Sequence, residues 1–249
     1  NSLYQNIDKK TKLISISHIP TGGGLINPAH DVGRIAKKYA IPFLLDACQS
    51  VGQIHLDVKA IGCDFLSGTG RKYLRGPRGT GFLYVQEDWI ERLEPPLLDQ
   101  FAAELIDAET YEVRTDAKRF ENWERYFAGQ AALGKAVDYA MELGLKTIER
   151  RVFDLAACLR TELQETGFVT LTYQGEKKCG IVTFEHLRLN AEQVKIQLSN
   201  HKINVSTSSG SGMKLSYLDR GLDGLVRASV HYYNTEDEFN KFVEALRSL

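Results

Sequence analysis

The 249-residue sequence predicts an α/β fold, in which a part with a mostly parallel sheet is followed by a smaller α+β module. In the first third, short apolar segments alternate with segments of helical spacing. The continuous apolar segment Pro42–Asp46 is typical of a strand that a parallel sheet buries on both faces. In the last third, strands and helices follow each other in a different order. We therefore expect two domains, 1–144 and 145–249, with the boundary near Gly144.

The first domain is expected to begin with strands that alternate with helices. The predicted strands are Lys12–Ser17, Pro42–Asp46, Cys63–Ser67 and Gly81–Val85, and the predicted helix is Pro28–Tyr39. Between residues 89 and 124 the pattern is weak, and we expect loops and short elements. Glu124–Leu143 is predicted to be a helix that ends at Gly144 and carries one apolar stripe, formed by Tyr126, Leu133, Val137, Ala140 and Met141.

The second domain is expected to combine a small sheet with long helices. The predicted helices are Leu145–Glu165, Asn190–Asn200 and Thr235–Leu249, and the predicted strands are Phe168–Tyr173, Gly180–Glu185 and Leu225–Tyr232. Asn190 with Gln193, and Thr235 with Glu238, have the spacing of capping boxes, so each pair marks the start of a helix.

Composition and charge exclude several classes of function. Lys and Arg number 31 and Asp and Glu number 32, and this balance argues against a nucleic-acid partner bound by bulk charge. No apolar segment approaches the roughly 18 residues of a membrane span, so we expect no membrane association. The 4 cysteines form no C-x-x-C pair, so we expect no metal site. We interpret them as reduced thiols of a cytoplasmic protein.

Polar and charged residues follow two of the predicted strands. Asp46 ends one strand, where open α/β sheets place their ligands, and Gln49 follows three residues later. A helix cap or a local turn would also explain this acid. After the next strand, Thr69, Arg71 and Lys72 lie among glycines, a composition that suits an anion such as phosphate. The alternative is a basic surface loop.

Two further segments carry candidate residues. Thr21 precedes Gly22-Gly23-Gly24, which does not spell the dinucleotide-binding fingerprint, so we favour a tight connection from strand to helix. Near the end of the chain, Arg227 alternates with apolar residues and shares one predicted strand face with Ser229 and His231. A guanidinium on an interior strand favours a carboxylate partner, whereas an arginine on an edge strand needs no ligand.

In this order, the segments resemble the class V aminotransferase family of pyridoxal-phosphate (PLP) enzymes. The matching segments are SHIPTGGGLINP, LLDACQSVGQIHLDV, CDFLSGTGRKYLRGPRGTGFLYV, RFENW and VRASVHYYNTEDE. The family includes cysteine desulfurases, C–S lyases and isopenicillin-N-epimerase-like proteins. The resemblance extends from about Lys12 to the C-terminus. It implies a type-I PLP-dependent transferase fold, with a partial PLP-binding large domain and a small C-terminal domain.

The resemblance also implies roles for individual residues. Lys72 would form the Schiff base with PLP, and Asp46 would pair with the pyridine nitrogen. Gln49 would bond the ring hydroxyl, and Thr69 and Arg71 would bind the phosphate. Arg227 would hold the carboxylate of a small amino-acid substrate. Thr21 stands where the desulfurase branch carries an Asn, and we count it among the cofactor-binding residues.

Several departures from the desulfurase branch define the function that we expect. The expected loop of residues 206–213 contains no cysteine that could take sulfur as a persulfide. The desulfurase branch carries a segment of small residues with Thr after its Arg-Phe-Glu, whereas Arg119-Phe120-Glu121 is followed by Asn122 and Trp123. We therefore expect C–S lyase or transaminase-type chemistry through Lys72, in a homodimer. Nothing upstream of Lys12 resembles the family's phosphate loop, so we expect a partial copy of a longer enzyme. The alternatives are a truncated, non-catalytic scaffold or interaction module and a nucleotide-binding Rossmann domain.

Overall fold

The computed structural model describes residues 2–173, 175–209 and 214–249, and the chain divides into two compact units. The first unit consists of Asn1–Ser17, Pro28–Cys48 and Leu56–Tyr139. The second consists of His18–Asn27, Gln49–His55 and Ala140–Leu249. The two short segments His18–Asn27 and Gln49–His55 thus belong to the same unit as the C-terminal half. The division into a partial PLP-binding large domain, 1–144, and a small C-terminal domain, 145–249, stays a prediction.

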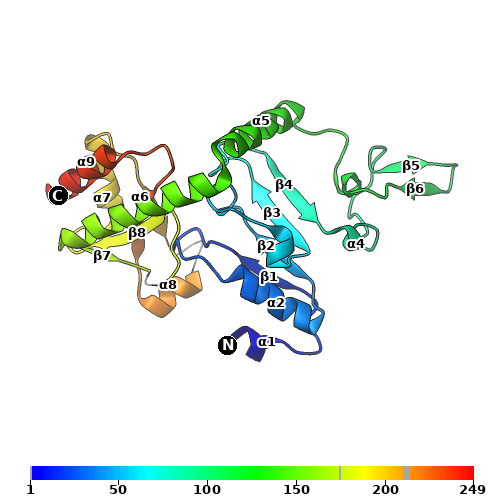
Figure 1. Ribbon diagram of the computed structural model, residues 1–249, viewed down its shortest axis with the longest axis horizontal. Helices are drawn as coiled ribbons and strands as arrows, with labels where there is room; N and C mark the ends of the chain where they lie inside the picture. The colour runs from blue at the N-terminus through cyan, green and yellow to red at the C-terminus, as the bar shows by residue number, and fades with distance from the viewer. Residues whose placement is uncertain (1, 174, 210–213) are drawn as a thin grey trace. The chain divides into compact units, whose positions relative to one another are not determined.

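The first unit is built on a four-stranded sheet of order β1-β2-β3-β4 (Figure 1). The strands are β1 (Ile14–Ser17), β2 (Phe43–Asp46), β3 (Phe65–Thr69) and β4 (Gly81–Val85). β1, β2 and β3 are parallel, and β4 is antiparallel to β3. Phe43 and Leu45 of β2 are fully buried, as the apolar segment predicts. The mostly parallel sheet of the α/β fold is confirmed.

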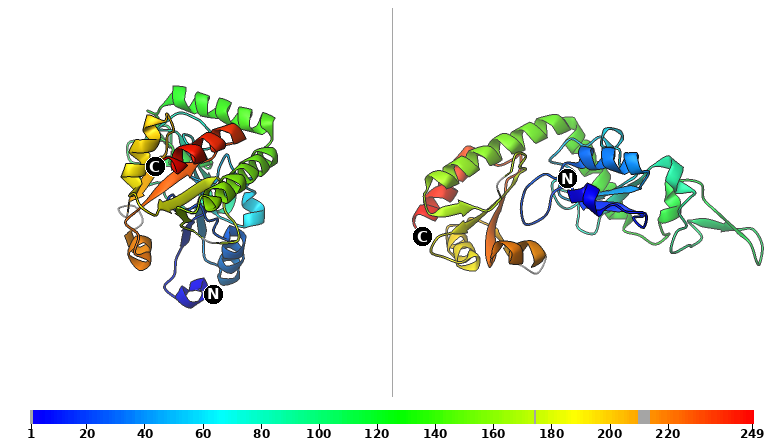
Figure 2. Two further views of the ribbon diagram at one scale, coloured as in Figure 1. Left: turned by 90° about the vertical axis from the view of Figure 1, so that its left-hand side faces the viewer. Right: turned by 90° about the horizontal axis from the view of Figure 1, so that it is seen from below.

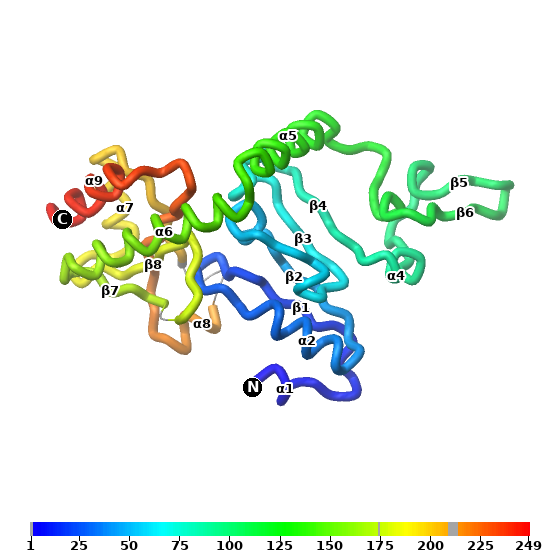
Figure 3. Tube along the Cα trace, viewed as in Figure 1, coloured from blue at the N-terminus to red at the C-terminus, as the bar shows by residue number. Residues whose placement is uncertain are grey.

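Short helices and a hairpin complete the first unit. The elements are α1 (Ser2–Asn6), α2 (Ala29–Tyr39), α3 (Val58–Ile61), α4 (Glu87–Ile90), the hairpin β5 (Ala103–Leu105) with β6 (Tyr111–Val113), and the 3₁₀ helix η1 (Ala117–Phe120). α2 connects β1 to β2 (Figure 3). It buries Ala29, Val32 and Ala36. The β5–β6 hairpin projects away from the four-stranded sheet (Figures 1 and 2). The weak sequence pattern of 89–124 thus corresponds to short elements.

Helix α5 (Phe127–Leu143) ends as predicted, but its apolar stripe is mostly exposed. Leu133 and Ala140 are buried, whereas Tyr126, Val137 and Met141 are exposed. The predicted apolar stripe is therefore covered at only two of its five residues. In the first unit α5 contacts the loop after β3 through Leu133, whose Cδ1 lies close to two glycines of that loop, and through Tyr139, whose ring centroid lies 5.7 Å from the Arg75 guanidinium.

The second unit packs helices on one face of a four-stranded antiparallel sheet. The sheet has the order β7-β8-β10-β9, formed by β7 (Val169–Leu171), β8 (Ile181–His186), β10 (Gly224–Ser229) and β9 (Ser206–Ser209). The helices are α6 (Leu145–Glu165), α7 (Ala191–Asn200), α8 (Lys214–Arg220) and α9 (Glu236–Arg247). α6, α7 and α9 lie beside the strands (Figure 2). They share one hydrophobic core with β7, β8 and β10. Phe184 and Phe242 meet edge to face there, with ring centroids 6.2 Å apart.

The local signals that define these elements are mostly confirmed. Both predicted capping boxes are present, at Asn190 and at Thr235. Two expectations need correction. Ser206–Ser209 form strand β9 and not a loop, while residues 210–213 of the predicted loop lie outside the described residues. β10 ends at Ser229, so the predicted strand to residue 232 is too long. Among the described residues, no helix has the length and apolar character needed to cross a bilayer.

Candidate active site

Asp46 lies at the carboxyl end of β2, and both of its carboxylate oxygens accept hydrogen bonds. Ser17 at the end of β1 donates its hydroxyl to Oδ2 at 3.1 Å. The Cys48 backbone amide donates to Oδ1 at 3.0 Å. The parallel register places Ser17 directly opposite Asp46, and Asp46 opposite Ser67. The end of β1 and the backbone just after β2 therefore fix the position of this carboxylate.

Asp46 is held in its ionised form. Burial raises the pKa of this half-buried carboxyl, but the hydrogen bonds from Cys48 and Ser17 and the positive charge of Lys72 lower the pKa below its usual 3.8. In the first unit the structure thus brings Lys72 within electrostatic range of Asp46. A carboxylate that stays charged can hold a proton on a basic nitrogen that it contacts.

Lys72 lies in a loop closed by its own hydrogen bonds. The loop joins β3 to β4, and the Gly70 and Gly76 amides donate to Thr80 O and Gly70 O at 2.9 and 2.7 Å. Lys72 is half-buried in this loop, whereas Arg71 is exposed. The half-buried Thr69 lies at the end of β3 and donates to Thr80 O at 3.4 Å. The three predicted residues therefore occupy one strand end and the loop that follows it.

Thr21 and Gln49 meet in the second unit. The Gln49 side-chain amide donates to the hydroxyl of Thr21. Gln49 is buried, at 4% exposed, and its Oε1 has no hydrogen-bond partner among the described residues. The sequence placed these residues in separate segments with no predicted contact between them. The structure joins them and leaves one buried acceptor on Gln49 that a donor group could satisfy.

Arg227 lies on β10, an interior strand of the second sheet. Its register partners are Thr183 on β8 and Ser206 on β9, so the edge-strand alternative is wrong. The Arg227 Nε donates to Ser229 Oγ at 3.1 Å, which confirms that these two side chains share a face. His231 lies beyond the end of β10, and its ring stacks on Tyr233 at 4.4 Å between centroids. His231 is therefore not part of the strand face that Arg227 and Ser229 share.

The 4 cysteines are free thiols of different accessibility. Cys63 and Cys179 are buried, and burial raises the pKa of each to about 11. Cys48 and Cys158 are half-buried. Burial first, and then the neighbouring Asp46, raises the pKa of the Cys48 thiol, although Lys72 lowers it. Each thiol is therefore stabilised in its protonated form, which is the weaker nucleophile.

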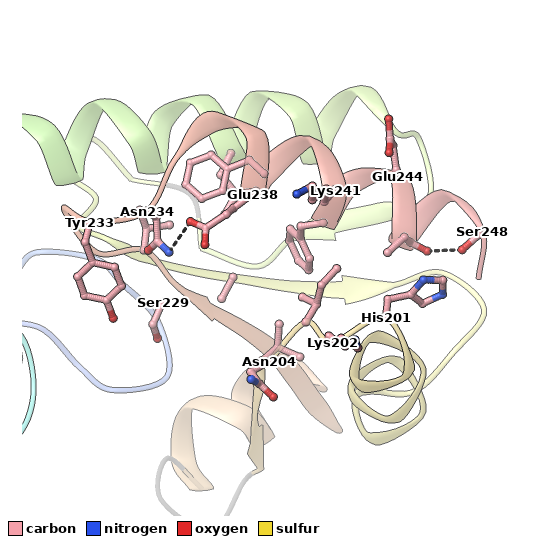
Figure 4. Close-up of a pocket in the computed structure, with 18 residues that line it drawn as sticks. His201, Lys202, Asn204, Ser229, Tyr233, Asn234, Glu238, Lys241, Glu244 and Ser248 are labelled. Atoms are coloured by element: carbon pink, nitrogen blue, oxygen red, sulfur yellow. Dashed lines mark hydrogen bonds between the residues drawn. The ribbon is translucent and has the colours of Figure 1, made fainter.

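A groove of about 1020 Å³ lies between α9, residues 201–205 and the end of β10. Figure 4 shows His201, Lys202 and Asn204 along it, together with Tyr233 and Ser229. Its lining includes the apolar side chains of Phe239 and Phe242. Ser229 is the member of the predicted Arg227 face that lines this groove. The predicted site residues Asp46 and Lys72 belong to the first unit and do not line this groove.

Sequence reasoning missed two residues that hold the predicted site. Ser17 bonds Asp46, and the fully buried Gln53 bonds the backbone of Gln49. A signal for Ser17 was present, because it ends the strand before Asp46 and parallel strands align their carboxyl ends. No comparable signal identifies Gln53, since its partner Gly180 lies 127 residues away.

The chain matches a known family over almost its whole length. The profile described as Aminotransferase class-V covers residues 1–242. The chain therefore belongs to the class V aminotransferase family, whose enzymes depend on PLP. The structure has the type-I PLP-dependent transferase fold, as its solved neighbours show.

This chain aligns with only part of each of several relatives and solved structures. A probable cysteine desulfurase of Pyrococcus abyssi is 30% identical over 246 residues, which are 97% of this chain and 60% of the relative. The apo cysteine desulfurase of Thermococcus onnurineus has a TM-score of 0.90 at 30% identity, covering 95% of this chain and 59% of that one. A variant of C-DES with glycine covalently linked to its PLP cofactor has a TM-score of 0.86 at 22% identity, covering 99% and 63%. This chain spans about 60% of the length of the curated relatives it matches.

Proposed function

We propose that this protein is a PLP-dependent enzyme that cleaves a C–S bond of an amino acid, with cysteine as the candidate substrate. The observation that carries the proposal is the ionised Asp46 at a strand end, with Lys72 in the loop after the neighbouring strand. Relatives that are about 30% identical are named cysteine desulfurases, which supports sulfur chemistry on cysteine.

The residues present fit the cofactor. A carboxylate with a lowered pKa suits a pyridine nitrogen that must stay protonated. The buried Gln49 Oε1 lacks a donor among the described residues, so a hydroxyl of the ring would satisfy it. When bound, PLP supplies an electron-withdrawing ring that stabilises negative charge at the substrate Cα.

Lys72 has two proposed roles. Its side-chain amine would hold the cofactor covalently, because an unprotonated lysine is a nucleophile toward a carbonyl carbon, whose oxygen leaves as water. The same amine moves the proton at the substrate Cα. Asp46 keeps the cofactor nitrogen protonated, and Ser17 and the Cys48 amide hold Asp46 in place.

The other predicted residues bind and orient. Thr69 and the exposed Arg71 contact the phosphate, where the guanidinium gives a charge-assisted hydrogen bond. Gln49, held by Thr21, contacts the ring hydroxyl. Arg227 binds the substrate carboxylate through its planar fork. Fixing the carboxylate also fixes which bond at Cα is aligned for cleavage.

We propose that sulfur leaves without a protein-bound persulfide. Residues 206–213 contain no thiol, and the 4 cysteines that the chain does have are free and held protonated or buried. The free thiols also support a reducing, cytoplasmic compartment. The family resemblance supports a homodimer, which sedimentation of the purified protein would test.

Lysine variants test the proposal. Lys72→Ala and Lys72→Arg should abolish sulfide release from cysteine by the PLP-loaded protein. Lys59→Ala, at an exposed lysine of the same unit, is the matched control and should retain full activity. Sulfide release that survives in Lys72→Ala would refute the role of Lys72. If the wild-type protein releases neither sulfide nor an amino-group product from any amino acid, the non-catalytic scaffold is the better account.

A further inference from the structure

Cys179–Ile181, the residues that lead into β8, form hydrogen bonds or close contacts with three segments of the second unit. These segments carry the three residues of that unit to which the proposed function assigns roles: Thr21, Gln49 and Arg227. The bonds that join each segment to Cys179–Ile181 are formed by main-chain groups and by two buried or half-buried side chains, Gln53 and Arg160.

The glycine segment after Thr21 packs directly against Cys179–Ile181. The Cys179 amide donates to Gly24 O at 2.9 Å. Gly24 has φ +73°, and a Cβ at this position would lie 2.1 Å from Ile181 O. Only glycine permits this close approach. Gly23 packs on the ring of Tyr173, and this contact also fixes the position of the turn that ends in Gly24.

Gln53 joins the second segment to the same strand start. Its Nε2 donates to the backbone oxygen of Gln49, and its Oε1 accepts from the Gly180 amide at 3.1 Å. Because the Gly180 N–H can only donate, the orientation of the Gln53 amide is determined. Gln53 is 0% exposed, so both bonds are shielded from water. Losing them would leave buried polar groups without partners.

The third segment contains Arg227, Ser229 and Val230, and it bonds to the carbonyl group of Gly180. Gly180 O accepts from the Val230 amide at 2.8 Å, and Ser229 is paired with Ile181 in the β8–β10 register. Arg227 lies two residues before Ser229 on β10. From α6, Arg160 donates to Cys179 O and to Ile181 O, so the carbonyls on both sides of Gly180 are fixed.

We propose that Gln53 is a positioning residue that sets the place of Gln49 relative to Arg227. Its amide is the side-chain link between the backbone of Gln49 and the strand pair that carries Arg227. The inference rests on the proposed function for its catalytic meaning, because only then does Gln49 contact the cofactor and Arg227 the substrate. The hydrogen-bond linkage itself can be measured without cofactor or substrate.

Two variants separate the two bonds of Gln53. Gln53→Met keeps an unbranched side chain but removes both bonds. Gln53→Glu keeps an acceptor for the Gly180 amide and places a carboxylate against Gln49 O. Gln164→Met, on the exposed surface of α6, is the matched control. Hydrogen exchange measured by NMR on the chain without cofactor reports the Gly180 amide and the Gln49 side-chain amide.

In Gln53→Met, both amides should exchange about tenfold faster, the scale of one lost hydrogen bond. In Gln53→Glu, the Gly180 amide should stay protected while the Gln49 side-chain amide exchanges faster. Gln164→Met should match the wild type at both positions. If the Gln49 side-chain amide keeps its wild-type exchange rate in Gln53→Met, Gln53 only fills space and the inference is wrong.

The active protein gives a second, independent test. A displaced Gln49 with an intact Arg227 should lower kcat about tenfold or more and leave KM nearly unchanged, because orientation is lost while carboxylate binding remains. An unchanged kcat in Gln53→Met would contradict the inference. Should no variant or wild type show activity, the proposed function fails, and the exchange rates still decide the role of Gln53.

Discussion

Ser17 and Asp46 are direct neighbours on parallel strands, and the hydroxyl of Ser17 donates to Asp46 Oδ2 at 3.1 Å. The contact arises from the register of β1 and β2, which aligns the last residue of each strand. Together with the Cys48 amide, it satisfies both carboxylate oxygens of Asp46. The orientation of this carboxylate therefore depends on a residue 29 positions earlier in the chain.

Ser17→Ala should raise the pKa of Asp46 toward its usual 3.8. The folded-state pKa is lowered, so Asp46 contributes stability above pH 3.8 that is lost as the pH falls through the folded pKa. Removing the hydroxyl reduces this contribution, by about 0.5–1 kcal/mol once solvent screening is allowed for. NMR titration of the Asp46 carboxyl measures the shift directly. An unchanged midpoint would show that the Cys48 amide and Lys72 suffice.

Arg227→Ala should weaken amino-acid binding by about 1.5–3 kcal/mol, the range for a hydrogen bond to a charged group. The affinity for PLP should hardly change, because Arg227 is assigned to the substrate and not to the cofactor. Equilibrium titration with cysteine analogues measures the effect. Arg188→Ala, at an exposed arginine of the same unit, should have no effect. Equal losses in both variants would point to a general effect of positive charge.

His186 should make the stability of the second unit depend on pH. Its Nδ1 accepts from the Arg188 and Leu189 amides at 3.2 and 3.1 Å, so the ring must be neutral. Burial, and then the charge of Arg188, lowers the pKa of His186 below its usual 6.5. Below pH 6.5 the unfolded chain binds a proton that the folded chain rejects, so stability falls as the pH falls.

His186→Asn tests this dependence, because the Asn oxygen can accept the same bonds without titrating. Urea unfolding at pH 7.5 and 5.5 should show a smaller loss of stability in the variant than in the wild type. The same pH dependence in both proteins would assign the effect to other groups.

Reaction with cysteine should leave no persulfide on the protein. Residues 206–213 contain no thiol, and burial raises the pKa of Cys63 and Cys179 to about 11. Mass spectrometry of the intact protein after turnover checks this expectation. A stoichiometric persulfide on one cysteine, with activity lost when that cysteine is alkylated by iodoacetamide, would contradict it.

The elements were predictable where one local pattern determines the structure. The apolar segment ending at Asp46 became a buried parallel strand, and the capping boxes at Asn190 and Thr235 start their helices as expected. The apolar stripe predicted for Glu124–Leu143 is mostly exposed, because periodicity shows that a helix has an apolar face but not what covers that face. Tyr126 and Met141 are 55% and 61% exposed.

Contacts between distant segments were not predictable from local patterns. The bond between Gln49 and Thr21 spans 28 residues, and that between Gln53 and Gly180 spans 127. Arg227 was assigned to a strand correctly, but its interior position depends on β9, whose polar sequence Ser206–Ser209 resembles a loop. Pairing with β10, and not propensity, makes this segment a strand.

Lys72 is the proposed attachment point of the cofactor, and covalent trapping tests this role most directly. The protein is loaded with PLP, reduced with borohydride, digested and mapped by mass spectrometry. We expect one pyridoxyl group on the peptide that contains Lys72 and none in Lys72→Arg. A stoichiometric pyridoxyl group on any other lysine, retained in Lys72→Arg, would contradict the account.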